Sequence, residues 1–592
     1  MANNNDLSII LRNFIVLILL ACCTLIFTSV ISALGMMALT TGPAYAKKVL
    51  TTQDFGGLIT LSFVTLRTNV VWVLNNFDKF SNYENYFVKV ILSVVIPFGT
   101  YIYFVFKYKN QILEWKPFKQ PESQYGDAHW ATLSEMKKAK LFEKKGMLLG
   151  RYKDKYLVEY SFQHCLLFAP TGSGKGVGFV IPNLLFWHES AIVHDIKLEN
   201  YEKTSGYRFK VLKQKVFLWN PADQDGITHC YNPMDWVGRN AGALVDDVMK
   251  IAKFLLPKED FWVNEARALV TGLMLYLYAD KNKQKSLGET LRMIRSEDLA
   301  YTLAVVLDTL GGDIHPVSYM NLSAFLNKAD KERSGVCSTA SSALELWSNP
   351  FVDTATSKSH FNIGKFRIEP NTLYVGISPN NIERLRPLLQ IFYQQTGTIF
   401  TQKLPTKDEK LGVMMLLDEF PTLGEMNEIK TGIAYYRGYK VKVFLIVQDT
   451  DQLKDIYKDA GMNSFLSNCT YRITFAANNA TTADMISKLL GQKTIVNESS
   501  SKPKFLDLNP GSRTVNVTKT GRELLKPQEI LTLPRDEQII LIESKNPVRC
   551  NKIMYYKDKM FTKRLLPQTF VPKQEPYVAS TRTKKDENSG KK

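Results

Sequence analysis

Short apolar runs recur along the chain after about residue 126, and stretches with helical periodicity separate most of them. Each run has four to six residues and consists mainly of aliphatic and aromatic side chains, which is typical of buried strands. Alternation of such strands with helices predicts an α/β fold, in which helices cover a largely parallel sheet. The predicted strands are 165–168, 191–194, 216–219, 372–377, 413–417, 443–447, 470–475 and 538–542.

The pattern changes over 235–350, where the strand-like runs disappear and helical patterns such as VDDVMKIAKFLL and FWVNEARALVTGLMLYLYA follow one another. We interpret this stretch as an all-helical domain inserted into the α/β domain, which then comprises 126–234 and 351–566. Residues 496–518 are polar and predict a mobile loop. The final segment, 567–592, is polar, ends in TRTKKDENSGKK and is predicted to be disordered.

The amino-terminal part is the most apolar part of the chain. Residues 14–39 are about 26 consecutive residues without a charge, and 90–106 are about 17. A bilayer span needs roughly 20 apolar residues, so both runs predict transmembrane helices and a membrane anchor over 1–110. The alternative is a signal peptide, since AYA at 44–46 resembles a cleavage site. The first run, however, is far longer than a signal core of roughly 7–15 residues.

Positive charges predict the orientation of this anchor, because lysines next to a span favour the cytoplasmic side. Two spans then place both termini in the cytoplasm and residues 40–89 on the other side. Within this loop, 55–74 contains Arg67, so we interpret it as an interfacial or partner-facing segment and not as a third span. The lysines that follow the second run are Lys107, Lys109, Lys116 and Lys119.

Composition narrows the class of protein only in part. The 592 residues, 45% of them hydrophobic, suffice for at least two domains with cores of their own. The formal net charge of +18 suggests nucleic acid, an anionic membrane surface or acidic proteins as partners, without choosing among them. The 7 cysteines form no CxxC pair and no zinc spacing, which fits a reducing compartment and structural thiols.

The eight residues that directly follow the first predicted strand match most of the phosphate-loop pattern Gly-x-x-x-x-Gly-Lys-[Ser/Thr]. Glycines in this pattern let backbone N–H groups surround phosphate oxygens, while the lysine contacts the β- and γ-phosphates. A chance glycine turn is the alternative, but the motif lies where the chemistry needs it, between a predicted strand and a predicted helix. The eight residues are Ala169, Pro170, Thr171, Gly172, Ser173, Gly174, Lys175 and Gly176, of which the first and last depart from the pattern.

Polar residues at the ends of other predicted strands complete a candidate ATP and Mg²⁺ site. Asp418 and Glu419 follow the strand 413–417, where an aspartate can hold Mg²⁺ and a glutamate can polarise the attacking water. Gln448 follows the next strand and could sense the γ-phosphate. The alternative for each is an ordinary polar strand end.

For two further groups of residues, the sequence is compatible with a functional role and with a purely structural one. Arg437 precedes Gly438 in YYRGYK and could reach the nucleotide of a neighbouring subunit, or it could be a solvated arginine at a helix end. Asp195, Lys197 and Glu199, in VHDIKLEN, lie at a strand end of the kind that lines nucleotide crevices, or they belong to a structural turn.

Several ordered blocks resemble the TraG/VirD type of type IV secretion coupling protein, over roughly residues 1–560. They are APTGSGKGVGFVIPNLL, VHDIKLENYEKTSGYR, FWVNEARAL, YVGISPNNIERLRPL, LLDEFPTLG, YRGYKVKVFLIVQD and GRELLKPQEILTLP. The resemblance implies a bacterial inner-membrane ATPase with a RecA-like nucleotide-binding domain, an inserted all-alpha domain and two transmembrane helices. It also implies a homo-hexamer that passes relaxase–DNA complexes, effector proteins or both to the secretion channel.

The resemblance also assigns roles within the candidate site. It implies that Lys175 binds phosphate, that Asp418 and Glu419 form the Walker B pair, that Arg437 acts in trans and that Gln448 is a sensor. Family members tolerate glycine after the lysine, as at Gly176, so Mg²⁺ would depend more on Asp418, nucleotide oxygens and water. The all-alpha domain is implied to recognise substrates.

Three functions remain open from the sequence. The first is a substrate-coupling ATPase, favoured by the coherent set of strand-end residues. The second is a docking receptor that binds nucleotide with little hydrolysis, suggested by the absence of a hydroxyl group at Gly176. The third is an FtsK-like DNA translocase, suggested by the basic charge, although no carboxyl-terminal DNA-reading module is evident.

Overall fold

The computed structural model describes residues 125–238, 240–500 and 515–576, together with scattered single residues before 125. The chain divides into two compact units, Met1–Ser123 and Gln124–Lys592. The predicted membrane anchor over 1–110 and its two spans therefore lie almost wholly outside the described residues.

The predicted localisation, a bacterial inner membrane reached through two spans, is corrected by the structure. Among the residues that the structure describes, no helix combines the length and the apolar character needed to cross a bilayer. The helix α16 (Ile382–Thr401) illustrates the reason: it is long enough at 20 residues, but its first turns carry Glu383, Arg384 and Arg386.

Eleven strands form one sheet in the order β2-β1-β13-β12-β9-β3-β8-β7-β4-β6-β5. All eight predicted strands are present, each within two residues of its predicted bounds. The strands are β1 (Met147–Tyr152), β2 (Lys155–Glu159), β3 (Cys165–Phe168), β4 (Ser190–Asp195), β5 (Lys215–Trp219), β6 (Asn371–Gly376), β7 (Val413–Leu417), β8 (Val441–Val447), β9 (Tyr471–Thr474), β12 (Glu537–Ile542) and β13 (Val548–Asn551).

The prediction of a largely parallel sheet holds for the seven strands from β9 to β5, all of which pair in parallel. The remaining four strands, β12, β13, β1 and β2, pair antiparallel and extend the sheet beyond β9. Within the parallel part, β8 lies between β3 and β7. The segments that follow these three strands therefore emerge side by side at one edge of the sheet.

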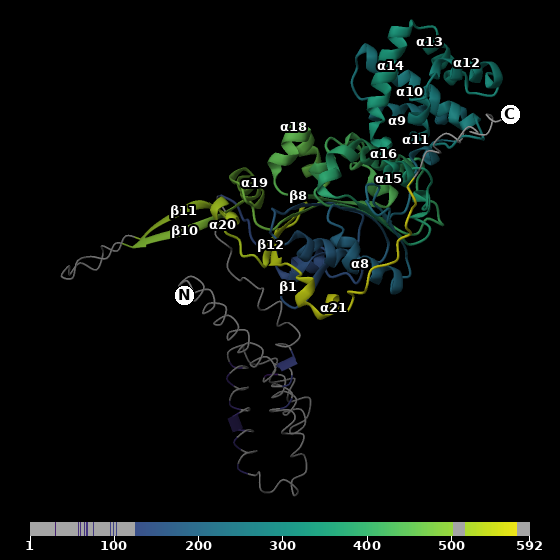
Figure 1. The fold of residues 1–592 in the computed structure, drawn as a ribbon. Helices are drawn as coiled ribbons and strands as arrows, with labels where there is room; N and C mark the ends of the chain where they lie inside the picture. The colour runs from purple at the N-terminus through teal and green to yellow at the C-terminus, as the bar shows by residue number, and fades with distance from the viewer. Residues whose placement is uncertain are drawn as a thin grey trace, which may run out of the picture. The chain divides into compact units, whose positions relative to one another are not determined.

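Helices cover both faces of the parallel part of the sheet, which explains why its strands are largely apolar. Along β3, Leu166 and Phe168 pack into one hydrophobic core, whereas Cys165 and Leu167 pack into the other. This alternation follows from the opposite directions of successive side chains in a strand. Figure 1 shows α8 (Glu199–Lys210) and α21 (Lys559–Thr562) on one side of the strands and α16 and α18 (Thr450–Asn468) on the other.

Between β5 and β6 the described residues form helices and no strand. The long helix α10 lies at the centre of this group and packs against α9, α13 and α14 (Figure 1). Gly272 of α10 permits a close approach, since a Cβ there would lie 3.1 Å from Leu322 Cδ2 of α13. The helices are α9 (Ala241–Leu255), α10 (Phe261–Ala279), α11 (Leu287–Ile294), α12 (Leu299–Leu310), α13 (Pro316–Leu326), α14 (Asp330–Ala343) and α15 (Pro350–Ala355).

The polar stretch 496–518, predicted to be a mobile loop, belongs in part to a hairpin. Strands β10 (Gln492–Ser500) and β11 (Val515–Glu523) pair antiparallel and project from the α/β unit (Figure 1). Residues 501–514 lie outside the described part of the chain. Polar sequence predicts exposure well, but in a two-stranded ribbon exposed residues still satisfy their backbone hydrogen bonds by pairing.

The ordered chain continues past residue 567, where a disordered tail is predicted. Lys573 pairs with Ile227 in an antiparallel bridge, and the Gln574 N–H donates to the Gly226 carbonyl oxygen at 2.7 Å. Residues 577–592 lie outside the described residues.

Candidate nucleotide-binding site

The phosphate loop leaves the carboxyl end of β3 and turns immediately. The Ala169 N–H donates to the Val447 carbonyl oxygen of β8 at 2.8 Å, which anchors the start of the loop to the sheet. Gly172 and Gly174 have φ of 76° and 85°, in the left-handed region that favours glycine. These two positions explain why the motif needs glycines there and not at Ala169.

A helix begins directly at the end of the loop, as the sequence predicts. Lys175 has helical dihedral angles and precedes a π-helical turn, η3 (Gly176–Val180), which continues as α7 (Ile181–Phe186). Pro182 falls in the first turn of α7, after the π-helical turn. The first N–H groups of this helix and its dipole are directed toward the loop, where they favour an anion.

Lys175 and the acidic pair come together across the sheet. The Lys175 ammonium nitrogen lies 2.6 Å from Glu419 Oε1 and 3.2 Å from Asp418 Oδ1. Both carboxylates follow β7, which is separated from β3 by β8 alone. The structure thus unites the predicted phosphate-binding lysine with the predicted Walker B pair, although Asp418 lies 243 positions beyond Lys175 in the chain.

Burial and charge determine the electrostatics of these carboxyl groups. Burial raises the pKa of Asp418, and the neighbouring Lys175 ammonium opposes that rise. Glu419 has φ 52° and ψ 50°, a left-handed conformation that is costly for a residue with a side chain. A non-glycine residue held in this region at the end of a buried strand is typical of a functional constraint.

Mg²⁺ is the metal that the sequence predicts, and the donor set around Asp418 fits a hard cation. Asp418 Oδ1 and Ser173 Oγ are both buried and make no hydrogen bond, the former having only its ionic contact with Lys175. Carboxylate and hydroxyl oxygens of this kind are ligands that Mg²⁺ accepts. At Gly176 a Cβ would meet no heavy atom within 4 Å, so the loop has room for the hydroxyl residue that is missing.

Gln448 directly follows β8, whose last residue, Val447, pairs with Phe168 of β3. Its side chain is partly buried, and its own N–H donates to Gln452 Oε1 at 3.3 Å. The strand order places it between the phosphate loop and the acidic pair. Of the predicted site residues, the loop, Lys175, Asp418, Glu419 and Gln448 therefore share one edge of the sheet.

Arg437 is the predicted residue that the structure does not bring to this edge. It lies in η9 (Tyr436–Tyr439), is exposed and precedes the first residue of β8, whereas Gln448 follows the last. At about 3.3 Å per residue, the seven residues of β8 place Arg437 roughly 20 Å from the phosphate loop. Its neighbourhood instead includes His164, whose pKa is lowered to about 4, mainly by burial and then by the charge of Lys442.

The carboxyl group of Asp195, at the end of β4, accepts hydrogen bonds from the start of α8. Its Oδ2 accepts from the Tyr201 N–H at 2.8 Å and its Oδ1 from Asn200 Nδ2 at 3.2 Å, both in α8. Burial raises the pKa of Asp195 to about 7, although these hydrogen bonds act in the opposite direction. The carboxyl group of Asp195 thus stabilises the turn between β4 and α8, as the structural alternative predicts.

One residue beside the loop escaped the sequence-based prediction. Lys552, which follows β13, donates from Nζ to the Ser173 carbonyl oxygen at 3.1 Å. Its ammonium nitrogen also lies 4.1 Å from the centroid of the Phe475 ring. Nothing in the local sequence VRCNK marks this lysine, because its proximity to the loop depends on the antiparallel extension of the sheet.

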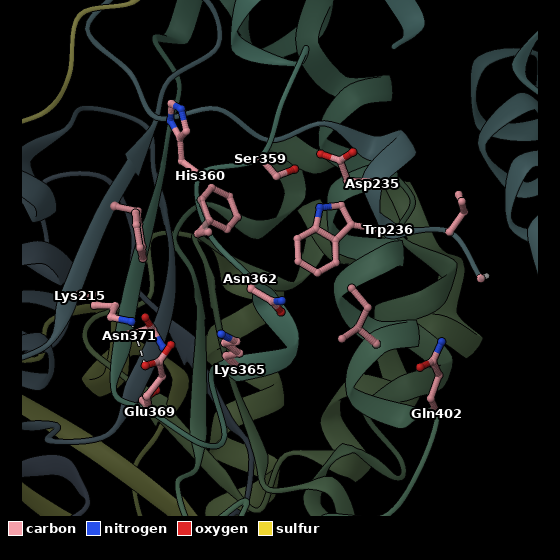
Figure 2. Close-up of a pocket in the computed structure, with 15 residues that line it drawn as sticks. Lys215, Asp235, Trp236, Ser359, His360, Asn362, Lys365, Glu369, Asn371 and Gln402 are labelled. Atoms are coloured by element: carbon pink, nitrogen blue, oxygen red, sulfur yellow. Dashed lines mark hydrogen bonds and ion pairs between the residues drawn. The ribbon is translucent and has the colours of Figure 1, made fainter. Parts of the chain in front are cut away.

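A cavity of about 740 Å³ lies elsewhere, near the amino ends of β5 and β6. Figure 2 shows Lys215 and Glu369, which form an ion pair of 2.9 Å, at one side of this cavity and Trp236 and Gln402 at the other. None of the predicted site residues lines it. The cavity is thus separate from the phosphate loop, which follows the carboxyl ends of the strands.

Comparison with known proteins gives the family. The model of a family described as "Type IV secretory system Conjugative DNA transfer" matches residues 129–577, and the chain belongs to this family. It is 30% identical over 482 residues to the protein VirD4 of Rhizobium radiobacter, which covers 78% of this chain and 68% of that protein. It is 29% identical over 513 residues to the conjugal transfer protein TraG of Escherichia coli, and the match covers 77% of this chain and 80% of that protein.

The resemblance to TraG/VirD coupling proteins, predicted from the ordered motifs, is thereby confirmed. A VirD4 from Agrobacterium fabrum is 31% identical over 459 residues, with 74% of this chain and 66% of that protein covered. The chain thus spans about two thirds of the length of the VirD4 proteins that it matches.

Solved structures confirm the RecA-like α/β core. The plasmid coupling protein TrwB in complex with ADP and Mg²⁺ aligns with a TM-score of 0.52 and 15% identity, over 74% of this chain and 97% of that one. TrwB in complex with the non-hydrolysable ATP analogue ADPNP also aligns with a TM-score of 0.52 and 16% identity, over 79% of this chain and 100% of that one. At such identities the likeness concerns the fold.

Proposed function

We propose that this protein is an ATPase that couples hydrolysis to the delivery of macromolecular substrates into a type IV secretion channel. The observation that carries the proposal is the contact of Lys175 with both Asp418 and Glu419. These are three charged groups of a phosphoryl-transfer site, brought by separate strands to one edge of a RecA-like sheet. Membership of the conjugative DNA transfer family and the nucleotide complexes of TrwB, which has the same fold, support it.

Each residue then has a role that follows from its chemistry. Backbone N–H groups of the loop and of the following helix bind the phosphates, and Lys175 moves from the acidic pair to the β- and γ-phosphates. Glu419 orients and deprotonates the attacking water, and Gln448 contacts the terminal phosphate from between the two strands. Asp418 would hold Mg²⁺, which supplies charge neutralisation of the phosphates when bound.

Arg437 requires a second copy of the chain if it is to act in hydrolysis. It lies at the opposite edge of the sheet from Lys175, so it reaches no nucleotide held by its own subunit. In a homo-hexamer, where each subunit presents one edge to the next, an exposed arginine at that edge could complete the neighbouring site. We therefore propose the ring assembly and the trans role of Arg437 together.

The substrates are proposed to be relaxase–DNA complexes, effector proteins or both, recruited through the helical region 235–350. The group α9 to α14 supports this division, because it forms a helical body set apart from the strands (Figure 1). The formal net charge of +18 is compatible with nucleic acid. Channel components of the secretion system are the remaining proposed partners.

The test is steady-state ATP hydrolysis by the purified full-length chain, with and without single-stranded DNA, beside Lys175→Ala and Glu419→Gln. We expect turnover in the unmodified chain and loss of turnover in both variants. DNA-stimulated turnover supports nucleoprotein substrates, and turnover indifferent to DNA supports protein substrates. Turnover that persists in both variants contradicts the proposal.

A second candidate function is a docking receptor that binds nucleotide with little hydrolysis. The observation that favours it is Gly176, which offers Mg²⁺ no hydroxyl ligand. Under this function, nucleotide binds with normal affinity but turnover is absent, and Glu419→Gln still supports substrate transfer. An FtsK-like DNA translocase, in contrast, requires DNA-dependent turnover that is independent of a secretion channel.

A further inference from the structure

The sheet topology brings the end of β13 to the phosphate loop. Strand β13 is antiparallel to β12, and β12 is antiparallel to β9, so β13 runs in the same direction as β9 and β3. The residues that follow these strands, Lys552 and Phe475, therefore emerge at the same edge as Ala169. Lys552 is 377 residues beyond Lys175 in the sequence and adjacent to its loop in space.

The contacts of Lys552 fix its ammonium group in place. Nζ donates to the Ser173 carbonyl oxygen at 3.1 Å and lies 4.1 Å from the centroid of the Phe475 ring. The main chain is fixed as well, since the Lys552 N–H donates to the Asp536 carbonyl oxygen at 2.7 Å. Lys552 is only 5% exposed. A Cβ placed on Gly178 would lie 3.6 Å from the Cβ of Lys552. The side chain thus packs between η3 and the loop.

A hydrogen bond to this carbonyl has a consequence for phosphate binding. The Ser173 carbonyl and the Gly174 N–H belong to one peptide unit, and in a planar trans peptide the two point in opposite directions. A donor that holds the carbonyl outward thereby turns the N–H toward the inside of the loop. Gly174, with φ 85°, has no Cβ to restrain this peptide, and the Ser173 hydroxyl makes no hydrogen bond that could.

We infer that Lys552 is a positioning residue of the nucleotide site, whose ammonium group presets the Ser173–Gly174 peptide so that its N–H faces the phosphates. This inference rests on the proposed nucleotide-binding function. The cation–π contact with Phe475 holds the ammonium beside the loop. The same positive charge favours the anionic ligand over the empty loop.

The charge of Lys552 depends on pH, which gives its positioning role a measurable signature. Burial lowers the pKa of Lys552 to about 8, and the nearby Asp536 carboxylate opposes this effect. Ser173 and Phe475, the two residues that contact the ammonium, carry no ionisable side chain. Bound phosphates raise the pKa of Lys552, so affinity is highest below pH 8 and falls as pH rises through it.

The experiment measures the Kd of a fluorescent ADP analogue for the full-length chain, between pH 7 and pH 9. Variants are Lys552→Met, which keeps the length without the charge, Lys552→Arg, which keeps the charge, and the exposed Lys557→Met as matched control. At pH 7 we expect Lys552→Met to raise Kd about tenfold, since a hydrogen bond with a charged donor is lost, and Lys552→Arg to retain most of the affinity. Turnover at saturating ATP changes less than the KM.

The pH profile separates positioning from a merely structural role. Affinity of the unmodified chain should fall between pH 7 and pH 9, and Lys552→Met should remove that fall, whereas Lys557→Met leaves it in place. Phe475→Leu should weaken affinity less than Lys552→Met and shift the fall. An unchanged Kd in Lys552→Met, or the same pH dependence with and without Lys552, overturns the inference.

Lys175→Ala distinguishes this inference from the proposed function. If nucleotide binding depends on Lys175 and is indifferent to Lys552, the nucleotide site stands and the positioning role falls. If the unmodified chain binds no nucleotide, both fall. Should Lys552→Met fail to fold, judged by its melting temperature, Lys552→Arg and the pH profile of the unmodified chain still decide the outcome.

Discussion

Lys175 and Glu419 form an ion pair of 2.6 Å, although one follows β3 and the other follows β7. The pair exists because β3 and β7 are parallel and flank the same strand, β8, so that both chain segments emerge at one edge. Glu419 adopts a left-handed backbone conformation to reach this position. Bound phosphate would compete with Glu419 for the ammonium, which would free the carboxylate to act on water.

Glu419→Gln is expected to abolish hydrolysis and to preserve nucleotide binding. The amide keeps the shape of the side chain but cannot accept a proton from water, and loss of a general base costs roughly 10²–10⁴-fold in rate. Steady-state turnover and the Kd of a fluorescent ATP analogue check the two halves. Lys175→Ala serves as the control that should lose binding as well as turnover, and a Glu419→Gln protein that turns over normally would exclude Glu419 as the base.

Gly176→Ser is expected to strengthen Mg²⁺ dependence and to increase turnover a few-fold. A side chain at this position meets no heavy atom within 4 Å, and a serine hydroxyl there can ligate the metal. Gly178→Ser is the matched control, because its Cβ would lie 3.3 Å from the Phe475 ring and disturb the packing below the loop. Turnover measured against Mg²⁺ concentration reports the effect, and a Gly176→Ser protein with lower turnover and unaltered Mg²⁺ dependence refutes it.

Arg437→Ala is expected to reduce turnover at least about 100-fold while leaving nucleotide affinity unchanged, as for an arginine supplied in trans. Its distance from the phosphate loop of its own subunit excludes a direct role there. Mixing it with Lys175→Ala should restore activity, because one partner supplies the loop and the other the arginine. In a randomly mixed ring about a quarter of the interfaces are competent, so recovery approaches that fraction of normal turnover, and no recovery speaks against the trans role.

Acid sensitivity is expected to depend on His194 in β4. Its ring is fully buried, makes no hydrogen bond and packs edge-on against Tyr393 at 6.1 Å between ring centroids. Burial lowers its pKa from 6.5 to about 4. Because the unfolded chain takes up a proton first, stability is present above pH 6.5 and is lost as pH falls toward 4, by about 2 kcal/mol at pH 5.

Urea denaturation at pH 8 and pH 5 measures this loss, which His194→Leu should reduce. His129 is the control of opposite sign, since its hydrogen bond to the Asp127 carbonyl oxygen raises its pKa. His129→Gln should therefore make the chain more acid-sensitive. An equal loss of stability in His194→Leu and in the unmodified chain would show that other groups govern the acid response.

The parallel part of the sheet was predictable from the sequence because its strands are buried on both faces. Such strands appear as short apolar runs, and all eight predicted runs form strands. Strands β1, β2 and β13 escaped prediction since their runs are short or interrupted, as in KYLVE and VRCN. The hairpin β10–β11 escaped for the opposite reason: its residues are polar, and polar sequence alone does not distinguish a paired ribbon from a loop.

The sequence by itself determined the chemistry of the candidate site, since the loop, the acidic pair and Gln448 each lie directly after a strand that its apolar residues identify. Tertiary structure alone decided which of these residues meet. It joined Lys175 to Glu419, separated Arg437 from both and brought Lys552 under the loop. The physical reason is that strand order and direction depend on contacts between residues hundreds of positions apart, and no local pattern of side chains records that pairing.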